Sequence, residues 1–182
     1  MSLKAAPHFW PGKLRTAFVF SVPGRHEKTC SQPVAGATGR NLEDALTILH
    51  RRRPDLFGSS KRYDYRITNA YDKPIWPKQN KGRSEATAGE IEGRSNRDRV
   101  VRELKGCNLI VWCGKKAQHV ESLVADRLAS KIHIEVPHLS PMALWSLKVP
   151  RGSPSLDGTT VSEARIELWV TQVLEQCDCP AR

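Results

Sequence analysis

Polar side chains follow three short apolar runs of the chain, and their types are suited to chemistry on a bound ligand. The first run leads into Ser21 to Glu27, the second ends at Asn69, and the third is followed by His138. A histidine can donate a hydrogen bond to developing negative charge, and an asparagine amide both donates and accepts. A stretch rich in glycine and proline at 33–39 adds backbone N–H groups that can converge on an anionic or polar ligand.

The elements that must position these residues alternate along the chain. Apolar runs with the length of buried strands occupy 17–20, 63–68, 108–113 and 131–136. Apolar residues at helical spacing occupy 41–50, 96–104, 115–130 and 162–174, and Asn96 is expected to cap its helix. This alternation predicts a three-layer α/β/α sandwich with a central four-stranded, mostly parallel sheet. Because ligands bind beyond the carboxyl ends of such strands, we expect the three polar exits to converge.

The chain is predicted to form one domain over residues 1–182. We expect an irregular arm at 1–16, an exposed loop at 72–95 with few core residues, and a linker at 150–161 before the C-terminal helix. No apolar stretch has the length of a membrane span, and the N-terminus lacks the apolar region of a signal peptide. The prediction is a cytoplasmic monomer with no membrane partner.

The charge balance favours a polyanionic partner such as DNA. Lys and Arg total 29 against 19 Asp and Glu, which gives a formal net charge of +10, and each phosphate that they neutralise releases condensed counterions. The alternative is a basic surface that binds nothing. The five cysteines form no recognisable disulfide or zinc framework, so no metal and no cofactor are expected.

The spacing of the first loop resembles a known motif. Pro23-Gly24-x-x-Glu27, followed by Pro33-x-x-Gly36-x-x-Gly39, resembles the first motif of the uracil-DNA glycosylase superfamily. It is nearest to the branch with a Gly-Glu-x-Pro-Gly-x-x-Glu signature, but without that branch's iron–sulfur cysteines, because no Cys precedes Cys30. His138-Leu139-Ser140-Pro141 resembles the second motif, His-Pro-Ser-Pro, and Asn69 resembles the asparagine that reads the pyrimidine edge.

This resemblance implies a uracil-DNA glycosylase-like fold and a monofunctional DNA glycosylase, which flips a damaged or modified pyrimidine out of DNA and hydrolyses its N-glycosidic bond. The implied catalytic residues are His138, which stabilises the leaving base, and Glu27 or Asp72, which position water with His26 as a further candidate. The implied base-binding residues are Ser21, Val22, Pro23, Gly24, His26, Val34 and Asn69. The implied DNA-binding residues are Gly36, Gly39, Arg40, Ser140, Met142, Lys115 and Lys116.

Three positions depart from the family pattern. Ser21 and Val22 stand where relatives carry a carboxylate or amide that positions water, and Val34 replaces a phenylalanine that stacks on uracil. The loss of that ring favours a bulkier base, such as the glucosylated hydroxymethylcytosine of phage DNA, over uracil. The alternatives are a uracil-DNA glycosylase of base-excision repair and a catalytically silent DNA-binding protein on the same fold.

Structural roles remain open for several of these residues. Glu27 is also placed to brace its own loop, Asn69 to form a turn, and Met142 to pack in the core.

Overall fold

The sheet has five strands in the order β1-β3-β2-β4-β5, in a computed structural model that describes residues 4–148 and 161–178. Its four parallel strands are β2 (Thr16–Phe20), β3 (Arg66–Asn69), β4 (Leu109–Cys113) and β5 (Ile132–Val136). The prediction of four strands was wrong by one, because β1 (Phe9–Trp10) pairs antiparallel with β3 and makes the sheet mixed. A strand of two residues is too short to produce a periodic pattern in the sequence.

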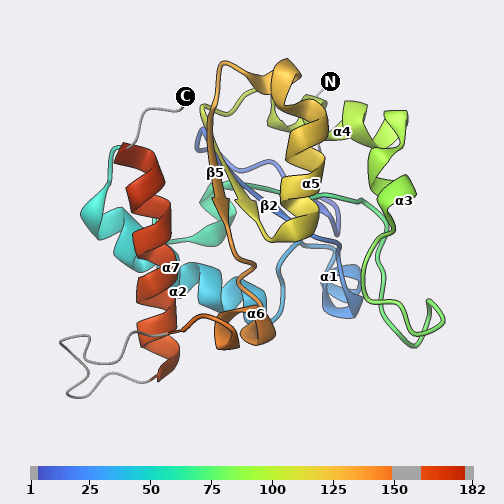
Figure 1. Cartoon of the computed structure of the whole chain (residues 1–182), viewed down its shortest axis with the longest axis horizontal. Helices are drawn as coiled ribbons and strands as arrows, with labels where there is room; N and C mark the ends of the chain where they lie inside the picture. Colours follow the sequence, from blue (N-terminus) through green and yellow to red (C-terminus); the bar gives the residue numbers. More distant parts are fainter. Residues whose placement is uncertain (1–3, 149–160, 179–182) are drawn as a thin grey trace.

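Helices cover both faces of the sheet (Figure 1). On one face, α2 (Ala37–Arg52) and α7 (Val161–Asp178) pack against alternate residues of β2, β4 and β5, such as Phe18, Val111 and Ile134. On the other face, α3 (Ala88–Glu92), α4 (Arg94–Leu104) and α5 (Lys115–Val124) cover Val19, Ile110 and Trp112. Every residue of β2 and β4 is buried, as expected for central strands covered on both sides. The α/β fold class and the layered arrangement are therefore confirmed.

Shorter elements connect these layers. They are α1 (Arg25–Cys30), the 3₁₀ turns at Arg62–Asp64 and Ala125–Leu128, and α6 (Pro141–Trp145). The predicted arm at 1–16 contains β1 and the first residue of β2, and the predicted linker at 150–161 lies, apart from Val161 in α7, outside the described residues.

The segment at 72–95 is more ordered than the sequence indicates. Ile75, Ala86 and Ile91 are buried, and the segment contains α3 and the start of α4. Asn96 does not cap α4 as predicted, because the helix begins at Arg94 and the Asn96 side chain instead donates to the carbonyls of Ala70 and Ile91. An inward-pointing asparagine with two local acceptors is thus satisfied inside the helix.

Candidate active site

A cavity of about 590 Å³ opens beyond the carboxyl ends of β2, β4 and β5. Its lining residues come from four segments that are far apart in the sequence: Ser21, Glu85, Cys113 to Lys116, His138, Ser140, Met142, Ala143 and Ser146. The parallel register places these strand ends at one edge of the sheet, which is where α/β folds hold their ligands.

The imidazole of His138 has a defined tautomer. Its Nδ1 accepts a hydrogen bond of 3.0 Å from the backbone N–H of Ser140, and a backbone amide can only donate. Burial lowers the pKa of His138 to about 4, so the ring is neutral near pH 7 and carries its proton on Nε2. The ring also meets the edge of Phe20 at a centroid distance of 5.4 Å. His138 therefore presents one fixed N–H donor.

Gly114 allows the His138 loop to approach β4 closely. Its φ is +89°, and a Cβ at this position would lie 2.9 Å from the Cβ of His138. Only glycine adopts this backbone conformation without cost. Gly114 also donates to the carbonyl of Val136 at 2.8 Å and precedes the first turn of α5. It fixes the position of His138 relative to the N-terminus of α5.

The lowered pKa of His138 has a consequence for stability. Between about pH 6.5 and pH 4 the unfolded chain binds a proton at this side chain and the folded protein does not. The free energy of unfolding is therefore expected to fall as the pH falls through this window. In urea denaturation, a His138→Asn variant should lose less stability between pH 7 and about pH 4.5 than the unaltered protein. His133, whose pKa is raised by Glu121, contributes equally to both proteins. Equal losses would contradict the burial of a neutral His138.

Glu85 supplies a carboxylate that the first motif lacks. Its Oε2 accepts a hydrogen bond of 2.5 Å from the hydroxyl of Ser21, and both residues line the cavity with His138. Glu85 is exposed, whereas the neighbouring Ala86 is 2% exposed and anchors this part of the loop in the core. Glu85 is not recognisable in the sequence, because no pattern in a charged loop indicates contact with a residue 64 positions away. The one indication of such a residue in the sequence was that Ser21 and Val22 lack the carboxylate that the family motif has at these positions.

Glu27, Asp72 and His26, the predicted water-positioning residues, are not among the residues that line this cavity. The two carboxylate oxygens of Glu27 accept hydrogen bonds from the backbone N–H groups of Gly24 at 3.0 Å and Ala35 at 3.1 Å. Glu27 therefore braces the loop, which is the structural role that the sequence left open. His26 is exposed and Asp72 is half-buried.

The remainder of the first motif builds the loop rather than the cavity wall. Val34 is 5% exposed, packs in the core against the α2 side of the sheet, and has a φ of +47°, which is unusual for a β-branched residue. Gly39 is needed because a Cβ there would lie 1.8 Å from the carbonyl oxygen of Val34. Gly36 is the N-cap of α2. Val22, Pro23 and Gly24 are likewise absent from the lining residues.

Asn69 ends β3 beside Phe20, its register partner on β2. Its side chain is 3% exposed, and its Oδ1 has no hydrogen-bond partner among the described residues. The backbone is held by α4, since Arg99 donates to the Asn69 carbonyl at 2.9 Å while pairing with Glu103 at 2.6 Å. A buried amide oxygen without a partner costs free energy and is unusual in a native fold. Asn69 therefore has an unpaired buried acceptor, but it is not among the residues that line the cavity.

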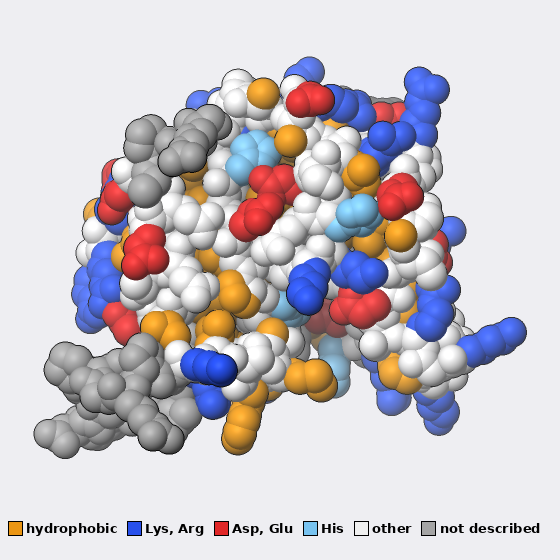
Figure 2. Space-filling model, in the orientation of Figure 1, with side chains coloured by type: hydrophobic (Ala, Val, Ile, Leu, Met, Phe, Trp, Pro, Cys, Tyr) orange, Lys and Arg blue, Asp and Glu red, His pale blue; other side chains and the backbone are white. Residues whose placement is uncertain are grey.

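Four of the seven predicted DNA-contacting residues line the cavity, namely Lys115, Lys116, Ser140 and Met142, whereas Gly36, Gly39 and Arg40 do not. Lys115 and Lys116 begin α5 and line the cavity, as does Ser140, whose hydroxyl caps α6 by accepting from Ala143. Met142 is 85% exposed, so it is not a core residue. Figure 2 shows hydrophobic side chains projecting from the lower edge of the molecule, where Figure 1 places α6. Arg40 instead lines a second cavity, which lies between α2, α6 and α7.

Within the described residues, no group of three or more His, Cys, Asp or Glu side chains could hold a metal ion, and no helix is long and apolar enough to cross a membrane. Burial raises the pKa of Cys113, the one cysteine that lines the cavity, so it is a protonated thiol rather than a nucleophile. The polar groups available for chemistry in the cavity are therefore His138, the Glu85–Ser21 pair, the lysines and the serine hydroxyls.

No model of a known protein family matches this sequence, and no curated protein matches it.

Proposed function

We propose that this protein is a monofunctional DNA glycosylase, built on a uracil-DNA glycosylase-like fold, that excises a modified pyrimidine and leaves an abasic site. The observation that carries the proposal is that one cavity contains a neutral histidine donor, His138, and a carboxylate, Glu85, held by Ser21. Hydrolysis of an N-glycosidic bond needs one group for the leaving base and one for the attacking water.

His138 acts on the leaving base. When the bond between C1′ and the base nitrogen breaks, the electron pair goes to the base and negative charge develops on its carbonyl oxygen. The Nε2–H of an imidazole that burial keeps neutral stabilises that charge with little reorganisation. The N-terminus of α5 and the side chains of Lys115 and Lys116 add positive potential on the same cavity wall. The base then takes a proton from solvent.

Glu85 acts on the water. Its carboxylate accepts a proton as the water oxygen bonds to C1′, and it also stabilises the positive charge that develops on the sugar. The Ser21 hydroxyl orients the carboxylate through the hydrogen bond of 2.5 Å. This arrangement gives the protein the water-positioning group that Ser21 and Val22 cannot supply, and it weighs against the catalytically silent alternative. No lysine nucleophile takes part, so the DNA strand is not cleaved.

We assign base recognition and base flipping to two further residues. Asn69 does not line the cavity, and its assignment to base reading rests on its unpaired amide oxygen, which is suited to accept a hydrogen bond from the exocyclic amino group of a cytosine. Met142 projects from α6 at the mouth of the cavity and is placed to fill the gap that an extruded base leaves in the stack. The net charge of +10 supports binding to the phosphate backbone.

The size and polarity of the cavity favour a bulky modified cytosine over uracil. A volume of about 590 Å³ lies in the range of sites that hold drug-sized ligands, and is larger than an unmodified pyrimidine needs. The hydroxyl groups of Ser140 and Ser146 and the carboxylate of Glu85 offer hydrogen bonds to a sugar substituent. The room does not come from Val34, whose side chain lies in the core.

The test uses duplex and single-stranded oligonucleotides that carry uracil, hydroxymethylcytosine or glucosylated hydroxymethylcytosine at one position. After incubation, hot alkali cleaves any abasic site, and the products are separated by gel electrophoresis. We expect cleavage at glucosylated hydroxymethylcytosine that exceeds cleavage at uracil, and no strand break before alkali. Efficient release of uracil alone would contradict the modified-base assignment. Binding without release of any of the three bases would contradict the enzyme assignment.

A further inference from the structure

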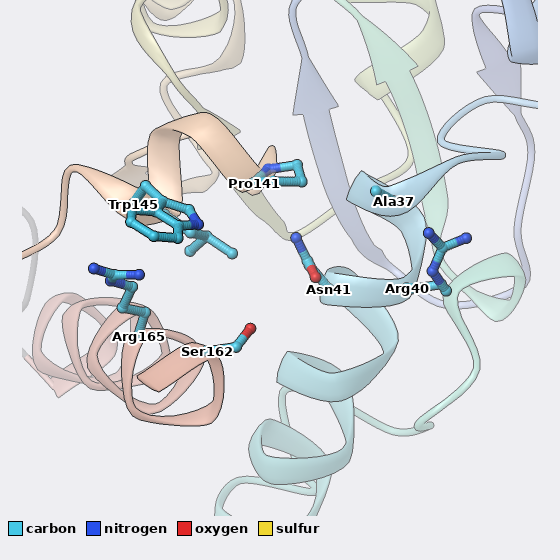
Figure 3. Close-up of a pocket in the computed structure, with 8 residues that line it drawn as sticks. Ala37, Arg40, Asn41, Pro141, Trp145, Ser162 and Arg165 are labelled. Atoms are coloured by element: carbon cyan, nitrogen blue, oxygen red, sulfur yellow. The ribbon is translucent and has the colours of Figure 1, made fainter. Parts of the chain in front are cut away.

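A second cavity of about 620 Å³ lies between α2, α6 and α7 (Figure 3). Trp145 and Arg165 form one side of it, and Arg40 lies at the opposite end, with Asn41, Pro141 and Ser162 between them. The lining residues include two arginines and no carboxylate. None of them belongs to the cavity that contains His138.

The aromatic side chain in this cavity is exposed without an evident structural reason. Trp145 is 73% exposed, although a tryptophan ring is costly to leave in water. The guanidinium of Arg165 lies over its ring, 4.7 Å from the centroid, and leaves the rest of the ring open to solvent. The Nε of Arg165 is buried and has no hydrogen-bond partner among the described residues. An open aromatic face beside a guanidinium group is suited to a flat ring attached to an anion.

The helix α6 separates the two cavities. Pro141, Leu144 and Trp145 face the second cavity, whereas Met142 and Ala143 face the first. Met142 and Trp145 are both exposed and stand on this single turn of helix. A polynucleotide strand that crosses α6 can therefore place one nucleotide in each cavity.

We propose that the second cavity binds an unpaired nucleotide of single-stranded DNA. Its base stacks on Trp145 and its own phosphate contacts Arg165, while Arg40, at the opposite end of the cavity, contacts the phosphate of the adjoining nucleotide. The choice of DNA as the ligand rests on the proposed function, whereas the site itself rests on the cavity, the exposed ring and the two cations. Because a stacked ring accepts every base, the site is expected to bind without sequence preference. It favours single strands over duplex, whose bases are already stacked.

The test is fluorescence anisotropy with labelled oligothymidylates of increasing length, which contain no base for the enzyme to release. Affinity is expected to rise in a step once the oligonucleotide is long enough to cross α6. Trp145→Ala should weaken binding of the longer oligonucleotides about 5- to 100-fold and remove the step, while Trp145→Phe keeps most of the affinity. Arg165→Ala should reduce the slope of log affinity against log salt by about one, whereas Arg94→Ala, at a side chain 91% exposed on α4, serves as the matched charge control.

Wild-type affinity and an unchanged length dependence in Trp145→Ala would overturn the proposal, as would equal effects of Arg165→Ala and Arg94→Ala. Tighter binding of duplex than of single strands would also overturn it. Circular dichroism and thermal melting of each variant exclude unfolding as the cause. If no base is released from any substrate but Trp145 controls the length step, the glycosylase assignment fails and the second site stands. If bases are released and Trp145→Ala binds normally, the second site alone fails.

Discussion

A His138→Ala variant is expected to release the target base about 10²- to 10³-fold more slowly than the unaltered protein, which is the usual cost of removing one donor to a developing oxyanion. The reason is the fixed Nε2–H: the Nδ1 of His138 is occupied by the Ser140 amide, so the ring has one orientation and one proton to donate. The measurement is a single-turnover rate with enzyme in excess, because slow release of the abasic product would hide the chemical step.

Two controls separate catalysis from folding for this residue. Thermal melting reports the stability lost when this half-buried imidazole is removed, and anisotropy reports whether DNA binding is kept. His138→Gln retains an N–H donor of similar reach, and we expect it to recover part of the rate. If the rate falls only in proportion to the folded fraction, His138 is a structural residue.

Glu85→Gln is expected to lower the single-turnover rate about 10²- to 10⁴-fold, because that is the usual contribution of a general base to the rate. DNA binding should stay intact or become stronger, because the substitution removes one negative charge beside the phosphates. Ser21→Ala should have a smaller effect in the same direction, because the carboxylate remains and loses only the hydrogen bond of 2.5 Å that orients it. Glu175→Gln, at an exposed carboxylate on α7, is the matched control and should be neutral.

The same experiment discriminates among the carboxylates that the sequence singled out. Glu27→Gln should cost stability, because Oε1 and Oε2 each accept a backbone N–H, and it should affect the rate only through the loop. Asp72→Asn should have little effect on the rate, because Asp72 does not line the cavity. If Glu27→Gln abolishes base release without loss of stability while Glu85→Gln is active, the assignment of Glu85 is wrong.

The sequence predicted the four parallel strands and their covering helices because these elements are buried, and burial leaves a pattern. β4 is apolar throughout, β2 is apolar after Thr16, and α2 and α5 carry apolar residues at helical spacing. β1 was not predicted because two residues show no periodicity. The helix α3 was not predicted because it lies in a stretch rich in lysine, glycine, proline and serine. The packing of Ile75 and Ile91 under that stretch depends on tertiary contacts that a local window does not contain.

The candidate site was predicted in part for the same reason. His138 and Ser21 were accessible to sequence reasoning because Ser21 directly follows one recognisable strand and His138 lies two residues beyond another. The parallel register brings the two strand ends to one edge. Glu85 was not, because its partner Ser21 is brought to it by the fold alone. The role of Val34 was also hidden, since its positive φ turns the side chain into the core, whereas the position suggested a wall of the base pocket.

The strand order also determines when this site can form as the chain is synthesised. The central pair joins β2 near the N-terminus to β4 at Leu109–Cys113, and β3 alone covers the other edge of β2 before then. Until β4 emerges from the ribosome, one edge of a largely apolar strand has no partner, which is the condition under which nascent chains aggregate or recruit chaperones. Contacts between such distant segments also slow folding. Production of this protein should therefore respond more to growth temperature and chaperone supply than its size alone would suggest.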